Sequence, residues 1–579
     1  MAEANPSDPG LAPQPATARR IFAALRTTDA AIYGSFALVA AMLQIITWRG
    51  VTPYVLLTGD TANIGAMVAG WWNPERFVGD GALGDPRLFH FYFTIHILLV
   101  HLLSAVVGDI GTAFHVLLAP HVFAYLVGWY WVGRRVLGSR AWGLVFAATN
   151  FVCIPTMTGD YWGLVYDVQP RLTFATLLPY VLVPALRALD RPSLENALFI
   201  AAGGLVYAHP VSAPSVGFAF LVAFLVARGP RSSALRLILF ATRWSALSLI
   251  VAGPFAWIYL GHHEHGRHVA AGEVISVMKE FVGAEYYDVG AALRSYASSR
   301  PFALTFLLGL VCLWRTDRLK SGHKVFFASW LAGLFAASVG ITAIEQWACR
   351  RFGMLPVEID LIRNMRYAAP ICLLLIVEGA REAMDQARRT YGDLAGRAAL
   401  LAGSAVLAVW MVAFHVAGPF REAAACLRHG ALLCPPAQAA LRRDVLASLS
   451  GLPEREAVFL FSKHDESDLG MAIRYEALRP VAFTERDKNN FAYSSPDRLF
   501  SWRSLHDRMA SAASSAGTSS WLAAGAELAR STRARYLLAI ERVTIAPPGT
   551  RLVRTTNSFS ILDVSANPDG ASAPGIPAL

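Results

Sequence analysis

Residues Thr58–Tyr92 read TGDTANIGAMVAGWWNPERFVGDGALGDPRLFHFY and follow the first strongly apolar segment of the chain. This stretch is too polar, and too often broken by Gly and Pro, to cross a bilayer itself. It places Asp60, Asp80 and Asp85 among aromatic and glycine residues that suit a membrane–water boundary. Ionisable groups at a membrane are costly, so a protein that keeps them there usually uses them. We therefore expect this loop to carry the chemistry and the rest of the chain to be its scaffold.

The composition is that of a membrane protein. Of the 579 residues, 55% are hydrophobic and 16% charged, and the mean hydropathy is +0.42. A soluble chain normally carries about 25% charged residues. Many apolar runs of near-spanning length predict a polytopic α-helical membrane protein. Most Lys and Arg residues behind the net charge of +10 lie in short loops that orient the spans, so nucleic acid is not expected as a partner.

Apolar segments alternate with short basic loops along the first two thirds of the chain. The segments fall at about 30–48, 90–108, 110–133, 141–158, 172–189, 195–208, 212–229, 235–260, 301–316, 323–344, 367–381 and 397–418. The basic loops lie at 134–140, 187–191, 227–236, 315–324 and 381–389. These loops and the N-terminus should face the cytoplasm.

If every apolar segment crossed the membrane, an odd number of spans would separate two of the cytoplasmic regions. All basic loops can therefore share one side only if one early apolar segment does not cross. Residues 90–108 carry three His and have almost no linker to the next segment, so we expect them to lie along the outer leaflet. About eleven spans then remain, with the N-terminus inside and the C-terminus outside. The long loops, which are rich in acids, His, Trp and Arg, all fall on the outer face: 49–92, 159–171, 207–214, 261–300 and 345–366.

Four regions follow from these patterns: a cytoplasmic tail at 1–27, a membrane domain at 28–418, an extracytoplasmic α/β domain at 419–565 and a disordered tail at 566–579. Within the third region, β-rich stretches at 457–462, 479–484, 534–542 and 558–565 flank a polar, helix-compatible stretch at 502–528. Cys426 and Cys434 could form a disulfide if that side is oxidising, but sequence does not fix the pairing.

The three loop acids each have a functional and a structural interpretation. Asp60 follows Gly59, which permits a tight turn, and its carboxylate suits a general base or a ligand of a divalent metal. It is equally placed to cap the helix expected from Ala62. Asp80 is the second catalytic candidate and Asp85 a substrate-binding one, although Gly-Asp-Gly and Asp-Pro also form turns.

Basic residues of the outer loops are candidates for binding an anionic substrate. Arg363 and Arg366 are three residues apart, which puts both guanidinium groups on one helical face, suited to clamping a phosphate. They could instead snorkel or pair with Glu358 or Asp360. Arg171 is a similar, weaker case. His209 lies in a tight apolar turn, where a structural hydrogen-bonded role is the alternative.

No residue is assigned as a metal ligand. The run HHEHGRH at 262–268 is a compositional hint only. No phosphate-binding glycine loop, nucleophile elbow or zinc-protease motif is present in a convincing context. Any activated donor is therefore expected to arrive through the membrane.

This layout resembles the GT-C integral-membrane glycosyltransferases, which use polyprenyl-phosphate sugars. In that family a catalytic Asp follows the first span, matching Asp60, and many members end in an extracytoplasmic domain. The stretch NPERFVGDGALGDPRLF is similar to the DP-x-x-F-x-x-D loop of bacterial members, and the His209–Pro210 pair recurs in some. Thr61 and Ala62 stand where many members carry a second acid, so whether Asp60 works alone or with another loop acid stays open.

The resemblance implies sugar transfer at the periplasmic face of a bacterial inner membrane, to a glycan, lipid or protein hydroxyl. The lipid phosphate would be held by Arg363 or Arg366. No cofactor is identified, and a divalent cation such as Mg²⁺ or Mn²⁺ stays an alternative. The rival hypotheses are a lipid-linked oligosaccharide ligase or polymerase, a lipid or polysaccharide transporter or flippase, and a scaffold acting through residues 420–579.

Overall fold

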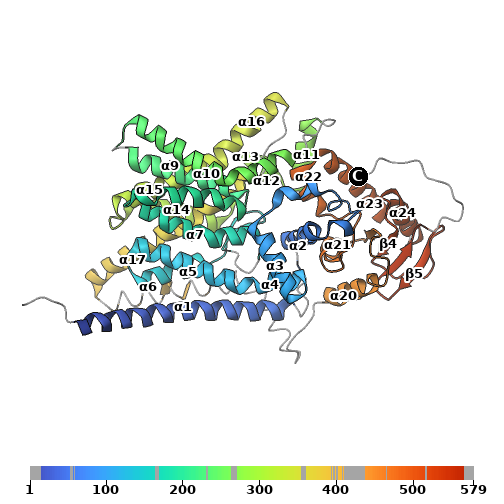
Figure 1. The fold of residues 1–579 in the computed structure, drawn as a ribbon, viewed down its shortest axis with the longest axis horizontal. Coiled ribbons are helices and arrows are strands. Elements are labelled where there is room, and N and C mark those ends of the chain that lie inside the picture. The colour runs from blue at the N-terminus through green and yellow to red at the C-terminus, as the bar shows by residue number, and fades with distance from the viewer. Residues whose placement is uncertain are drawn as a thin grey trace, which may run out of the picture.

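The computed structural model describes residues 15–51, 57, 59–163, 168–229, 232–262, 270–353, 360–392, 437–464, 466–514 and 518–565, with isolated residues between 394 and 409. Most of these residues are helical (Figure 1). Several predictions fall outside the described residues, namely those on residues 1–14, most of segment 397–418, the His-rich run at 263–268, the Cys426–Cys434 pair and the tail at 566–579.

Four helical stretches among the described residues are long and apolar enough to cross a membrane. They are Asp29–Thr47 in α1 (Pro15–Val51), Ile110–Leu137 in α4 (Ile110–Val116) and α5 (Leu118–Leu137), Ala234–Tyr259 in α10 (Ala234–His262), and Ser321–Phe352 in α15 (Ser321–Phe335), π-helical η7 (Ala336–Ile341) and α16 (Thr342–Phe352). The pair α13 (Val289–Ser298) and α14 (Arg300–Arg315) adds a fifth only if a span bends by 86°. The predicted count of eleven is therefore larger than the number of helices that qualify by length and composition.

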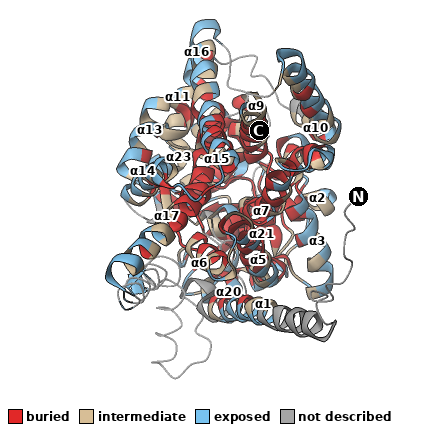
Figure 2. Ribbon diagram, turned by 90° about the vertical axis from the view of Figure 1, so that its left-hand side faces the viewer, coloured by how far each residue is buried: buried red, intermediate tan, exposed pale blue. Residues whose placement is uncertain are grey.

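The remaining helices of this half complete a bundle. They are α6 (Arg140–Asn150), α7 (Pro170–Ala188), η4 (Pro192–Leu194), α8 (Glu195–Gly204), η5 (Leu205–Tyr207), α9 (Ser212–Arg228), α11 (Ala271–Phe281), α12 (Ala284–Tyr287), η8 (Leu361–Tyr367) and α17 (Ala368–Tyr391). Helix α5 packs against α1, α6 and α7, while α9 packs along α15 and α14 along α17. Buried residues lie in the middle of the bundle (Figure 2). Trp129 and Trp330 are among the largest fully buried side chains. Apolar side chains such as Trp257 and Leu308 are exposed on α10 and α14.

The residues from Gly59 to Tyr92, which follow α1, fold into short helices. It forms α2 (Gly59–Trp72), η1 (Pro74–Arg76), η2 (Pro86–Leu88) and η3 (His90–Tyr92), followed by α3 (Ile95–Val107). Helix α3 has 13 residues, about 20 Å of rise, which is less than the roughly 30 Å hydrocarbon core of a bilayer. It is therefore too short to cross a bilayer straight. The His101 ring stacks on Trp72 with centroids 3.7 Å apart.

Residues from 437 onward form a mixed α/β unit. Its elements are α20 (Ala437–Leu449), β3 (Val458–Phe461), α21 (Ser467–Tyr475), α22 (Asp487–Ser494), α23 (Pro496–Ala513), α24 (Thr518–Ser531), β4 (Tyr536–Ala539), β5 (Arg551–Thr555) and β6 (Ser560–Asp563). The sheet order is β3-β4-β6-β5, with β3 and β4 parallel and the other pairs antiparallel. Three of the four predicted β-rich stretches are strands. The stretch 479–484 contributes only an isolated parallel bridge from Val481 to Val458.

The α/β unit packs directly on the loop after α1. Helix α2 packs against α21, as Figure 1 shows, and the Leu57 N–H donates to the Tyr475 hydroxyl at 3.1 Å. The Gly81 N–H donates to the Val481 carbonyl at 3.2 Å. A Cβ at Gly81 would lie 2.4 Å from the Ala482 carbonyl oxygen, so only glycine allows this approach.

Candidate active site

A cavity of about 290 Å³ lies where the bundle meets the α/β unit. Its walls come from α2, η3, the turn of the hairpin β1 (Ile154–Met157) and β2 (Asp160–Trp162), the start of α7, the turn before α9, η8 and α22. Five of the seven candidate residues line it: Asp60, Arg171, His209, Arg363 and Arg366. These residues come from loops as much as 306 positions apart in the sequence (366 − 60), and the fold brings them to one site.

Three arginines converge on one carboxylate at this cavity. Asp160 Oδ1 accepts from Arg366 Nη1 at 2.6 Å, from Arg171 Nη1 at 2.8 Å and from Arg363 Nη2 at 3.3 Å. The Asp160 side chain is fully buried. Burial alone would raise the pKa of Asp160, but the charges of Arg366, Arg363 and Arg171 lower it to about 2. The carboxylate therefore stays ionised and fixes the three guanidinium groups.

The arginine pair meets the geometric prediction in a tighter helix. Arg363 and Arg366 lie on η8, a 3-10 helix in which positions i and i+3 eclipse each other. Arg363 also pairs with Asp360 at 3.1 Å, one of the partners expected from the sequence. Within the cluster, and without Asp60 that also lines the cavity, three guanidinium groups outnumber the carboxylates of Asp160 and Asp360 by one.

Two donor atoms in this cluster have no protein partner. Nε of Arg363 and Nε of Arg366 are buried, and neither makes a hydrogen bond within the described part of the chain. Buried donors without acceptors are rare in folded proteins. Together with the excess charge, they indicate a site that suits an anionic group.

His209 lies beside the arginines in a fixed orientation. Its Nδ1 lies 2.8 Å from Ser212 Oγ, which accepts from the Tyr367 hydroxyl at 2.8 Å. Burial, and then the positive charges of Arg366 and its neighbours, lower the pKa of His209 well below its ordinary value. The imidazole is therefore neutral at physiological pH and adds no positive charge to the site.

Asp60 differs from the other acids of the cavity in being accessible. It lies in the first turn of α2 and is exposed, and no hydrogen bond or ion pair holds its carboxylate within the described residues. The preceding Gly59 has φ +61°, and its N–H donates to Asp468 Oδ1 at 3.2 Å. The backbone of this turn is thus held while the Asp60 side chain stays available, as a general base needs.

Asp80 does not reach the cavity. Arg474 donates to both of its oxygens at 2.8 Å, and both side chains are fully buried. The N–H groups of Ala82, Leu83 and Val481 also donate to Asp80. We therefore assign Asp80 no catalytic part and interpret it as an anchor between the loop and the α/β unit.

Asp85 also lies outside the cavity. Its carboxylate accepts the Arg87 N–H at the start of η2 and pairs with the side chains of Arg87 at 2.8 Å and Arg498 at 3.3 Å. The contact with the Arg87 N–H belongs to the turn role that the sequence left as the alternative.

An apolar groove of about 530 Å³ adjoins the cavity. It lies between α8, α9 and α10 and shares Pro210 and Tyr259 with the cavity lining. Its other walls include Phe218, Trp244 and Phe255. A ligand with an apolar tail and an anionic head could therefore occupy both spaces at once.

Sequence reasoning missed Asp160 and the α22 residues of the cavity wall, Asn490 and Tyr493. Asp160 follows a glycine, as Asp60, Asp80 and Asp85 do, but only its partners 206 residues away reveal its position. Asn490 exchanges hydrogen bonds with Asn63 of α2 at 3.1 and 3.4 Å. The recurring Gly-Asp pair was the one local signal available.

Comparisons with known proteins assign no role to these residues. No protein-family model matches the chain, and neither does any curated protein sequence. Within the described residues, no group of three or more His, Cys, Asp or Glu side chains is arranged to hold a metal ion.

Proposed function

We propose that the chain is a multi-pass glycosyltransferase of a bacterial inner membrane, similar in layout to the GT-C enzymes. It would move a sugar from a polyprenyl-phosphate donor to a hydroxyl of a glycan, lipid or protein acceptor at the periplasmic face. One observation carries the proposal: the apolar groove meets a cavity that contains both an arginine cluster and an accessible carboxylate.

The donor fits these two spaces by its chemistry. The prenyl tail would lie in the groove between α8, α9 and α10. Its phosphate would bind Arg363 and Arg366, whose unpaired Nε atoms and excess charge favour an anion. Asp160 would act as a positioning residue, since it holds three guanidinium groups in place before the donor arrives.

The reaction would be a single displacement. Asp60 would take the proton of the acceptor hydroxyl as its oxygen forms a bond to the anomeric carbon. The bond from that carbon to the phosphate oxygen breaks, and the lipid phosphate leaves with the electron pair. Arginine contacts would stabilise the charge that develops on the leaving group. One displacement inverts the anomeric configuration.

The proposal includes a topology. Eleven spans would place the N-terminus in the cytoplasm, and the α/β domain at 419–565 would lie in the periplasm beside the active site. The contacts of α2 with α21 and α22 favour this arrangement, because they join the loop after the first span to that domain.

The rivals predict different products. A lipid-linked oligosaccharide ligase or polymerase would use the same face but transfer a preassembled chain. A transporter usually carries its polar groups at mid-membrane on broken helices. Here the charged residues gather at the end of the bundle that meets the α/β unit.

The test uses the full chain in lipid nanodiscs with radiolabelled polyprenyl-phosphate sugars and a membrane-derived acceptor fraction. We expect transfer by the wild type and a loss of about 10²–10⁴-fold in Asp60→Asn, the usual effect of removing a general base. Asp190→Asn, in a predicted cytoplasmic loop, is the matched control and should keep full activity. Equal transfer by wild type and Asp60→Asn would remove Asp60 from the mechanism. No transfer with any donor would contradict the proposed function.

A further inference from the structure

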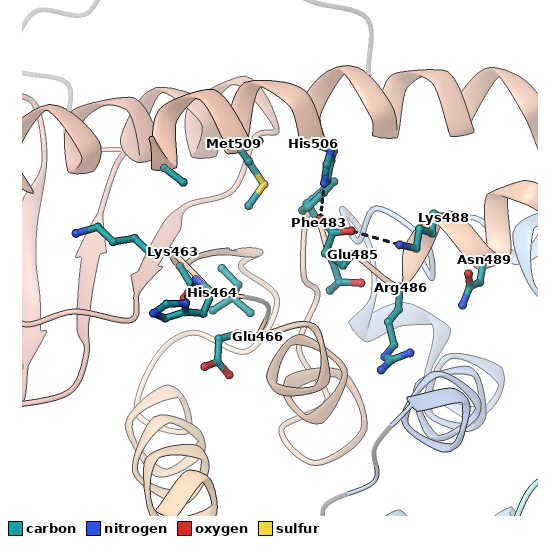
Figure 3. A pocket seen from close by; sticks show the side chains of 15 residues that line it. Lys463, His464, Glu466, Phe483, Glu485, Arg486, Lys488, Asn489, His506 and Met509 are labelled. Carbon is teal, nitrogen blue, oxygen red and sulfur yellow. Dashed lines mark hydrogen bonds and ion pairs between the residues drawn. The ribbon is translucent and has the colours of Figure 1, made fainter. Parts of the chain in front are cut away.

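A third cavity lies within the α/β unit and is larger than the candidate active site. It has a volume of about 420 Å³ and opens between α23, the segment after β3 and residues 483–489. Figure 3 shows Met509 and His506 facing it from α23, with Lys463, His464 and Glu466 on the opposite side. None of these side chains has a part in the proposed transfer chemistry.

The cavity lies where α/β folds bind ligands. Strand β3 has β4 on one side, and Val481 pairs with it in parallel on the other. After β3 the chain passes through α21 and reaches Val481 on one side of β3. It then runs through α22–α24 and returns as β4 on the other side. Crevices at the carboxyl ends of such strands, where the strand order reverses, are the usual ligand sites. Ser462, which follows β3, and Thr484, which follows the bridge at Val481, both line the cavity.

The cationic groups around the cavity are already neutralised. Each lining cation has an acidic partner, in the pairs Lys463–Glu541 at 3.2 Å, Arg486–Asp468 at 2.9 Å and Lys488–Glu485 at 3.7 Å. Acids also occupy the helix starts that could attract a phosphate, with Asp468 in the first turn of α21 and Asp487 in that of α22. The cavity thus differs in charge from the arginine cluster and suits a neutral polar ligand.

Aromatic rings supply an apolar wall. Phe483 stacks on Trp502 with centroids 5.9 Å apart, and His506 stacks on the same ring system at 5.1 Å. Phe483, which is 4% exposed, and His506 both line the cavity together with hydrogen-bonding side chains. Apolar faces combined with a few placed polar groups are typical of small-molecule sites. A sugar ring, with C–H faces and hydroxyl edges, matches both walls.

Two connections join this cavity to the candidate active site. Asn489 lines both cavities. Arg486, a lining residue, donates to the same Asp468 oxygen that accepts the N–H of Gly59, the neighbour of Asp60. A ligand in this cavity would therefore lie beside the turn that carries the proposed base.

We infer that this cavity binds a neutral glycan segment of the acceptor and delivers its terminal hydroxyl toward Asp60. That the bound glycan is the acceptor rests on the proposed function, whereas glycan binding itself is inferred from the cavity alone. It commits to an uncharged, polyhydroxylated ligand rather than an acidic glycan or a phosphate.

Binding can be measured without any transfer reaction. The full chain in nanodiscs is titrated with three neutral probes, maltohexaose, cellohexaose and α-1,6-mannohexaose, and with hexagalacturonate, following Trp fluorescence and isothermal heat. We expect at least one neutral probe to bind saturably and hexagalacturonate to bind at least tenfold more weakly. No binding by any neutral probe, or equal binding of the acidic one, would overturn the inference.

Two variants obstruct the cavity from opposite walls, and one serves as a control. Met509→Trp on α23 and His464→Trp on the opposite segment should each weaken the neutral probe at least tenfold. Ser504→Trp places the same ring on an exposed position of α23 outside the lining and should bind as the wild type does. Thermal unfolding midpoints show which variants are folded, and His464 is exposed, so its replacement is well tolerated. Wild-type affinity in a folded blocking variant would overturn the inference.

The outcome separates the two proposals. Glycan binding that the blocking variants abolish, without sugar transfer by the wild type, contradicts the proposed function but keeps the glycan site. Transfer by the wild type that both folded blocking variants retain contradicts the glycan site and keeps the proposed function.

Discussion

The molecule contains two buried arginine–aspartate clusters that have similar side chains but different surroundings. One joins Arg474 to Asp80 and Asp487, with every side chain closed off from solvent. The other gathers three arginines around Asp160 in the wall of a cavity. The first has more carboxylates than guanidinium groups and the second has fewer.

The two clusters also differ in whether their buried hydrogen-bonding atoms have partners. In the first, backbone N–H groups complete the carboxylates, including that of Thr484, which donates to Asp487 at 2.9 Å. Burial alone would lower the pKa of Arg474, but the charges of Asp487 and Asp80 raise it above its ordinary value. In the second, Nε atoms of Arg363 and Arg366 stay unpaired. A closed, completed cluster joins parts of a fold, whereas an open, incomplete one leaves capacity for a ligand.

The largest effect should come from breaking the closed cluster. Arg474→Met would leave Asp80 and Asp487 buried without a counter-charge, which costs about 3–5 kcal/mol. Thermal unfolding of the α/β unit in nanodiscs measures the loss. Arg498→Met removes a partly exposed arginine that pairs with Asp85 and is the matched control. An unchanged unfolding midpoint in Arg474→Met would refute the anchoring role.

A substitution in the open cluster around Asp160 should lower activity more than it lowers stability. Arg366→Met should lower kcat/KM for a polyprenyl-phosphate sugar by about 10²–10³-fold, the usual cost of losing one preorganised contact to developing charge. Asp160 keeps Arg171 and Arg363, so the unfolding midpoint should fall less than in Arg474→Met. Arg366→Lys should recover only part of the activity, because a point charge does not replace a guanidinium fork. A large loss of stability with full specific activity would reverse the assignment of the two clusters.

The pH dependence of stability should identify the Asp160 cluster. Its folded pKa of about 2 lies below the ordinary value of 3.8, and this difference corresponds to stabilisation on the order of 2 kcal/mol. Because the folded pKa is depressed, this stabilisation is present above about pH 4 and is lost as the pH falls through 2. The difference in unfolding free energy between wild type and Asp160→Asn should therefore narrow from pH 6 to pH 2. A difference independent of pH would show that Asp160 is not ionised.

The smallest effect should come from Asp85, which belongs to neither cluster. Asp85→Asn breaks pairs with Arg87 and Arg498 at the surface, and exposed pairs contribute at most about 1 kcal/mol. Transfer activity should stay at the wild-type level. A fall in donor affinity would instead return this loop acid to the substrate-binding set.

Local patterns in the sequence predicted the helices and strands better than they predicted which distant residues contact each other. The apolar run 235–260 matches α10, and 323–344 falls within the Ser321–Phe352 stretch. Arg363 and Arg366, which the three-residue spacing predicted to share one helical face, both contact Asp160. Spacing and periodicity suffice where the determining contacts lie within a few turns.

The sequence could not separate the Gly-Asp pairs from one another. Asp60, Asp80 and Asp160 share the same preceding residue, yet one is open, one anchored and one surrounded by arginines. Their partners lie up to 401 residues away, beyond any local pattern. The count of eleven spans came from apolar runs, whereas four described stretches, or five with the α13–α14 pair bent by 86°, qualify by length and composition.

The contact between Asp80 and Arg474 also sets an order of events during synthesis. The two residues are 394 positions apart, and a ribosome adding about 5–20 residues each second needs on the order of 20–80 s to cover that interval. During that delay the segment bearing Asp60 has emerged without the anchor that later secures it. The cavity beside Asp60 cannot be complete until α22 has been made, because Asn490 and Tyr493 form part of its wall.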